Sequence, residues 1–166
     1  MNGLEFLSPA LARAEADFEP VQRSPLERAL RQAPPGVRDL SLTGKLEVGG
    51  DVGELDLDDA EIVRISPDRA LVLCPPEEAR RHIEQLSTRG RSVVDVTGAL
   101  AGIEVTGEQL LRRLTDLDLD ALPATGMVAR VPATVLRHDE TFRIFFPQEY
   151  ADYVAQVVLD IAAGLP

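Results

Sequence analysis

The C-terminal part of the chain has a regular spacing of apolar and polar positions, and three of its segments have the spacing of an amphipathic helix. Residues 77–89 carry apolar side chains three or four positions apart and end at Gly90, a residue type that often follows a helix. The same spacing recurs after Gly107 and again after Pro147. The pattern therefore predicts three helices in this part of the chain, the last of which ends before Gly164.

Short runs rich in β-branched and aromatic residues lie between these helices and predict strands. The runs cover residues 69–74, 92–97, 103–106, 128–137 and 141–146. Short turns at 98–102 and 138–140 are expected to join the second run to the third and the fourth run to the fifth. The order strand, helix, strand, strand, helix, strand is that of the split-βαβ, ferredoxin-like folds. We therefore predict an α+β fold in which an antiparallel sheet is covered by helices.

The N-terminal part is less regular in its pattern. Residues 24–166 are predicted to form a single domain, preceded by an arm at 1–23 that contains a short helical turn. A helix is expected at 24–33, because a serine followed by a proline is a typical helix start. Alternating apolar and polar residues predict a strand at 40–48, and the acidic stretch at 51–61 is predicted to be a solvated loop.

The charge of the chain limits its expected partners. It has 17 basic and 28 acidic residues, which gives a net charge of −11. Nucleic acids and anionic membranes are therefore not expected as partners, because phosphate contacts need clustered lysines and arginines. The first residues do not have the pattern of a signal peptide, and no apolar run is long enough to span a membrane. A cytoplasmic location is expected.

Residues suited to catalysis or to metal binding are few. Lys45 is the only lysine and has no glycine-rich loop before it, which argues against a Schiff base and a P-loop. Cys74 is the only cysteine and is expected to be a buried, unreactive thiol. The aspartates at 116–120 lack the glycine and the glutamate of a calcium loop. His82 and His138 are not spaced as metal ligands. Both are expected at the surface or at the boundary between surface and core. We predict no catalytic residue and no metal site.

Aromatic residues gather near the C-terminus, where five of the seven fall within twelve positions. One interpretation is that they form the core between the last hairpin and the last helix. The other is that part of this surface docks a partner chain, since tyrosine and phenylalanine are common interface anchors. The residues predicted for such an interface are Phe142, Phe146, Tyr150 and Tyr153.

Several motifs occur in the order found in one known family. They are the runs at 66–73, 93–97, 103–107, 110–114, 122–126 and 142–153, which include Val-Val-Asp-Val-Thr and Phe-Arg-Ile-Phe-Phe-Pro. In this succession the chain resembles the gamma subunit of heterotetrameric sarcosine oxidase. More distantly, it is similar to the folate-binding domain of the glycine-cleavage T-protein, an aminomethyltransferase. The resemblance covers about three-fifths of the chain and is weakest at 37–63.

The resemblance implies a non-catalytic accessory subunit that packs against an alpha-type chain through its arm and its aromatic-rich end. In that family the alpha chain carries NAD and a folate site, and the beta chain carries flavins. T-protein relatives have a histidine and a methionine where this chain has Gly98 and Ala99, and their catalytic aspartate has no counterpart at 130–135. Asp95, Thr97 and Gly98 would then be a vestigial tetrahydrofolate pocket.

Two other interpretations remain open from the sequence. The chain is either a stand-alone folate-binding, aminomethyltransferase-like domain of one-carbon metabolism, or an unrelated ferredoxin-like protein that forms homo-oligomers. The Asp-Val-Thr turn at 95–97 favours the first of these. The missing carboxylate at 130–135 favours the accessory subunit instead.

Overall fold

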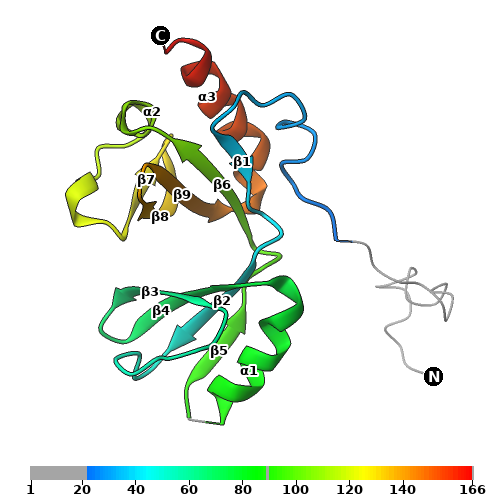
Figure 1. Ribbon diagram of the computed structural model, residues 1–166, viewed down its shortest axis with the longest axis vertical. Helices are drawn as coiled ribbons and strands as arrows, with labels where there is room; N and C mark the ends of the chain where they lie inside the picture. The colour runs from blue at the N-terminus through cyan, green and yellow to red at the C-terminus, as the bar shows by residue number, and fades with distance from the viewer. Residues whose placement is uncertain (1–21, 89, 166) are drawn as a thin grey trace, which may run out of the picture.

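Two antiparallel sheets stack on each other in the computed structural model, which describes residues 22–88 and 90–165 (Figure 1). The predicted arm at 1–23 therefore lies almost entirely outside the described residues. The predicted α+β class, with antiparallel strands covered by helices, is confirmed, but the strands form two sheets where one was predicted. None of the helices in the described ranges is long and apolar enough to cross a membrane.

The larger sheet has five strands in the order β1-β6-β9-β8-β7, and two helices cover its outer face. Its strands are β1 (Val37–Asp39), β6 (Leu100–Thr106), β7 (Ala124–Val128), β8 (Val131–His138) and β9 (Thr141–Pro147). Its helices are α2 (Glu108–Leu114) and α3 (Ala151–Ala163), and short 3₁₀ helices lie at Leu119–Ala121 and Gln148–Tyr150. Figure 1 shows α2 and α3 on the side of this sheet that faces away from the other sheet.

The smaller sheet has four strands in the order β3-β4-β2-β5. Its elements are β2 (Gly44–Gly49), β3 (Glu61–Ser66), β4 (Arg69–Cys74), β5 (Ser92–Asp95), a 3₁₀ helix at Pro76–Glu78 and α1 (Ala79–Ser87). Helix α1 and the loop before β3 pack on its outer face. The acidic loop at 51–61 is therefore more than a solvated loop, because it also covers part of the smaller sheet. Val52, Leu55 and Leu57 are buried there, while its carboxylates remain largely exposed.

Strand alternation explains how both faces of the smaller sheet are buried. In β4, Ala70 and Val72 pack toward α1, whereas Leu71 and Leu73 pack toward the larger sheet. The second pair belongs to a cluster that includes Phe145 of β9. A strand covered on both faces has an unbroken apolar run, and this is why residues 69–74 are almost continuously apolar.

Several predicted elements are confirmed. Strand 69–74, the helix after residue 77, the helix after Gly107, the 128–146 hairpin and the last helix all occur close to their predicted bounds. The predicted strand at 40–48 is divided, because a turn at 40–43 separates β1 from β2, and the amide of Thr43 donates to the carbonyl of Leu40 at 3.1 Å.

Two predictions of local structure are wrong. Residues 25–32 form successive turns and not a helix. The amide of Leu30 donates to the carbonyl of Leu26, as in one turn of an α-helix, but the described residues do not continue it into a regular helix. The strands at 92–97 and 103–106 are not a hairpin, because β5 pairs with β2 whereas β6 pairs with β1 and β9. The turn between them carries the chain from one sheet to the other.

Candidate functional site

The turn predicted to be the remnant of a folate pocket lies at this crossing between the sheets. The amide of Thr97 donates a hydrogen bond to the Asp95 carboxylate at 2.9 Å. The Thr97 hydroxyl accepts a hydrogen bond from the backbone amide of Lys45, also at 2.9 Å. Gly98 is exposed and has no heavy atom within 4 Å of the place where a Cβ would lie. The three residues thus lie together, but their hydrogen bonds fasten the turn to β2 and they line none of the clefts described below.

A cleft of about 520 Å³ opens between the two sheets on the side of β1 and β3. The turn before β2, the start of β3, the end of β4 and one face of β9 surround it. Residues along its walls include Arg38, Leu42, Glu61, Cys74, Arg143 and Phe145. Its volume is in the range of small-molecule sites, which makes it the candidate site for a ligand.

Arg38, Glu61 and Arg143 of this cleft form an ion-pair network with Glu104, whereas the lining carboxylate of Asp39 accepts hydrogen bonds from Ser24 and Ser41. Arg143 of β9 donates to Glu61 of β3 at 2.5 Å and to Glu104 of β6 at 3.0 Å. Arg38 of β1 lies 2.9 Å from the second carboxylate oxygen of Glu104. The Glu104 side chain is only 12% exposed, so its charge needs these partners. The network links the edge of the smaller sheet to the larger sheet, and it leaves the cleft without a free charge of either sign on these four residues.

Lys45 is completely buried behind the turn whose Leu42 and Thr43 line the cleft. Its Nζ donates to the carbonyl of Ser41 at 2.8 Å and to the carbonyl of Thr43 at 2.7 Å. Burial lowers the pKa of Lys45 to about 8, and the carboxylates of Asp95 and Asp39 oppose this shift. The ammonium group therefore holds the turn between β1 and β2, and an incoming substrate would have to displace those carbonyls. The sequence singled out Lys45 as the only lysine but gave no signal of its burial.

Cys74 is buried at the end of β4, as predicted. Burial raises the pKa of its thiol, and the nearby carboxylates of Asp95, Glu78 and Glu77 raise it further. A thiol in such surroundings is a poor nucleophile, because the thiolate is the reactive form.

His82 departs from its prediction. It was expected at the surface or its boundary, but it is 0% exposed on the inner face of α1, and neither ring nitrogen has a hydrogen-bond partner in the described part of the chain. It follows Ala79 and precedes Leu86 at helical spacing, which places all three on the buried face. Within residues 22–88 and 90–165, no group of three or more histidine, cysteine, aspartate or glutamate side chains is arranged to hold a metal ion.

The predicted interface residues divide into two pairs. Phe142 and Phe146 are each 1% exposed, so the prediction that they contact a partner is corrected for these two. Alternation along β9 turns them, with Ile144, toward α2 and α3. Tyr150 and Tyr153 are 42% and 46% exposed and remain available to a partner. Tyr153 lines a second cleft of about 410 Å³ beside α2 and the β7–β8 turn.

No family model and no curated protein sequence matches this chain. Its fold does match solved structures. One is a chain of heterotetrameric sarcosine oxidase from Corynebacterium sp. U-96, solved in complex with pyrrole 2-carboxylate. It has a TM-score of 0.68 and 16% identity over 86% of this chain and 95% of that chain.

Two further structures share the fold. The glycine cleavage system aminomethyltransferase T from Bartonella henselae has a TM-score of 0.55 and 16% identity, over 92% of this chain and 56% of that chain. The regulatory subunit of aspartate kinase from Thermus thermophilus, in its ligand-free form, has a TM-score of 0.50 and 10% identity, over 76% of this chain and 97% of that chain. The first two matches establish a T-protein-like fold, which is the fold that the sequence resemblance implied.

Proposed function

We propose that the chain is a non-catalytic accessory subunit, similar to the gamma subunit of sarcosine oxidase, that packs against an alpha-type chain in a sarcosine-oxidising complex. In this proposal the alpha-type chain binds NAD and folate, and this chain works in the cytoplasm without a cofactor of its own. The observation that carries the proposal is the match with one chain of heterotetrameric sarcosine oxidase, because it covers 95% of that chain. A nearly complete match to one chain of a multi-subunit enzyme supports the role of a subunit.

The contacts of the reactive side chains support a non-catalytic role. The amine of Lys45 is bonded to two carbonyls, and burial raises the pKa of Cys74. The exposed Tyr150 and Tyr153 lie at the aromatic-rich end where the proposal places the partner. Tyrosine is enriched in the surfaces that protein complexes bury between their chains.

Co-expression tests this proposal. The tagged chain is expressed with a candidate alpha-type chain from the same genome, and the eluate is separated by size-exclusion chromatography. The two chains are expected to co-elute in a constant ratio, and the control is the same alpha-type chain expressed with an unrelated tagged protein. A tagged chain that elutes alone, with the alpha-type chain well expressed and soluble, would contradict the proposal.

A second candidate function is that of a stand-alone folate-binding, aminomethyltransferase-like domain. The match with aminomethyltransferase T and the Asp95–Thr97 turn favour it. Calorimetric titration with tetrahydrofolate decides between the two candidates. Binding that is lost in Thr97→Val would support the folate-binding domain, whereas the absence of heat at millimolar ligand would remove it.

A further inference from the structure

The cleft beside Tyr153 brings together three elements that are distant in the sequence. It lies where the end of α2, the β7–β8 turn and the first half of α3 meet, and it measures about 410 Å³. Its walls include Arg112, Arg113, Asp116, Met127, Arg130 and Tyr153. We call it the arginine cleft.

The charge of the arginine cleft is opposite to that of the rest of the chain. It contains three arginines and one aspartate, although the whole chain has a net charge of −11. Arg112 is paired with Glu108, at 2.7 Å. Arg113 and Arg130 are exposed, and no carboxylate of the described residues forms an ion pair with either. Two guanidinium groups are thus free to bind anionic groups from outside the chain.

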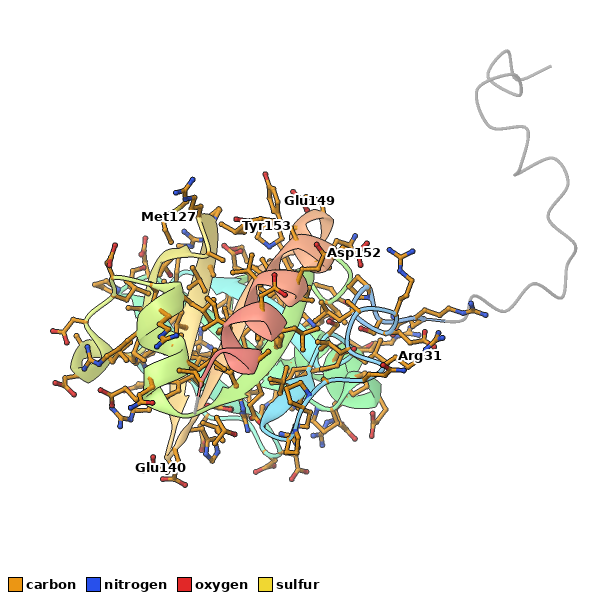
Figure 2. The ribbon with its side chains drawn as sticks, turned by 90° about the horizontal axis from the view of Figure 1, so that it is seen from above. Arg31, Met127, Glu140, Glu149, Asp152 and Tyr153 are labelled. Carbon is orange, nitrogen blue, oxygen red and sulfur yellow. The ribbon has the colours of Figure 1, made fainter. Side chains whose placement is uncertain are left out.

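Two exposed apolar side chains accompany these arginines. Met127 is 55% exposed and Tyr153 is 46% exposed. Figure 2 shows both projecting from the same side of the molecule, near Glu149 of the 3₁₀ helix at Gln148–Tyr150 and Asp152 of α3. Asp152 is paired with Arg28 at 3.1 Å. Methionine and tyrosine are adaptable and rigid anchors, respectively, in protein interfaces.

The turn that carries Arg130 has an unusual backbone. Ala129 and Arg130 have φ angles of 49° and 65°, so both central residues of this two-residue turn adopt the left-handed conformation. Glycine and asparagine are the usual residues in such turns, and a side chain there costs free energy. The turn therefore has an exposed arginine beside the cleft, at a position whose backbone conformation would suit glycine better.

We propose that the arginine cleft receives an acidic segment of the partner chain. Carboxylates of that segment bind Arg113 and Arg130, and an apolar side chain next to them packs on Tyr153 and Met127. The inference rests on the proposed accessory function and adds the chemistry by which the partner is recognised. A protein segment fits this surface better than a nucleic acid does, because it supplies an apolar side chain for Met127 and Tyr153 and carries fewer negative charges for the rest of the chain to repel than a polyphosphate does.

The chemistry of the cleft is tested with a short fluorescein-labelled peptide in which glutamates flank a phenylalanine and a leucine. Fluorescence anisotropy is expected to show binding that weakens as salt is added. A matched peptide with glutamines should bind about 10-fold more weakly, and the double variant Arg113→Ala/Arg130→Ala should lose a similar factor, or about 1.4 kcal/mol. Arg80→Ala, on the exposed face of α1, is the control and should bind as the wild type does. Equal binding of both peptides, an unaffected double variant, or no binding to the wild type would overturn the inference.

Co-elution of charge-reversed variants with the alpha-type chain distinguishes a failure of this inference from a failure of the proposed function. If the complex forms and Arg113→Glu/Arg130→Glu abolishes co-elution while Arg80→Glu does not, both are supported. If the complex forms equally well with the charge-reversed cleft, the inference is wrong and the accessory function stands. If no alpha-type chain co-elutes but the acidic peptide binds through the arginines, the accessory function is wrong and the cleft chemistry stands. Arginine-dependent self-association of the wild type would show a second copy, and not the alpha-type chain, as the partner.

Discussion

The ammonium nitrogen of Lys45 lies 6.0 Å from the centre of the Phe145 ring. This contact joins β2 of the smaller sheet to β9 of the larger one, at the place where the chain first passes between the sheets. The same nitrogen donates to the carbonyls of Ser41 and Thr43 in the connecting turn. One buried charge therefore organises the junction, which is an unusual use of lysine because a buried ammonium is costly unless it is bonded.

The first prediction concerns the dependence of stability on pH. Burial lowers the pKa of Lys45 to about 8 in the folded chain, whereas an unfolded lysine titrates at about 10.4. Between these values the unfolded state binds more protons, so Lys45 adds a contribution to the free energy of unfolding that rises with pH. Urea titrations from about pH 7 to about pH 9.5 should therefore show a more positive slope for wild type than for Lys45→Met. Identical slopes for the two proteins would contradict the assignment.

The second prediction concerns Gly102 in β6. A Cβ at this position would lie 2.7 Å from the Phe145 ring and 3.1 Å from the carbonyl oxygen of Leu40. Gly102→Ala should therefore lower the free energy of unfolding by about 1–3 kcal/mol through overpacking. Gly98→Ala is the matched control, since no heavy atom lies within 4 Å of its added carbon. Equal stability of the two variants in urea would show that the junction between the sheets is looser than described.

The third prediction concerns His82. Its ring is fully buried, and its two nitrogens lack partners among the described residues. Leucine at this position removes two unsatisfied polar atoms from the interior, so His82→Leu should raise the free energy of unfolding by about 1–2 kcal/mol. The control is His138→Leu, whose side chain is 53% exposed and whose effect should stay within about 0.5 kcal/mol. A destabilised His82→Leu protein would contradict the view that the buried ring costs stability.

The fourth prediction concerns the ion pairs that join β3, β6 and β9. Arg143→Met removes one of the two arginines bonded to Glu104, which is 12% exposed. The variant should lose about 1–3 kcal/mol of stability because a largely buried carboxylate loses a partner. Arg80→Met breaks a pair whose side chains are 91% and 70% exposed and should cost less than about 0.5 kcal/mol. The measurement is the difference between these two losses in parallel urea titrations, and equal losses would show that the network adds nothing to the junction.

The helices and the strands with strong patterns could be predicted from the sequence, but the division into two sheets could not. The runs at 92–97 and 103–106 are separated by a length that also suits a hairpin. Only the pairing of β5 with β2, which is distant in sequence, shows that the chain changes sheets there. β7 was missed because alanine and glycine are poor strand formers. β3 was missed because it follows directly on the acidic loop and contains a charged residue at its centre.

The arginine cleft and the surroundings of Lys45 were predictable only in part. Tyr153 was found because aromatic residues cluster near the C-terminus, but Phe142 and Phe146 share that signal and are core residues. Arg113 and Arg130 gave no sequence signal, because α2 and the β7–β8 turn are brought together by packing. Burial of Lys45 was equally invisible, since lysine is among the residue types least often buried.

Native mass spectrometry of the assembly purified through a tag on this chain tests the accessory function most directly. The account predicts a complex in which the 18.0 kDa chain is bound to an alpha-type chain in a fixed ratio. Dissociation in the gas phase should then release the 18.0 kDa chain. A spectrum that contains only the free chain or its own multiples, from cells in which the alpha-type chain is present, would contradict it.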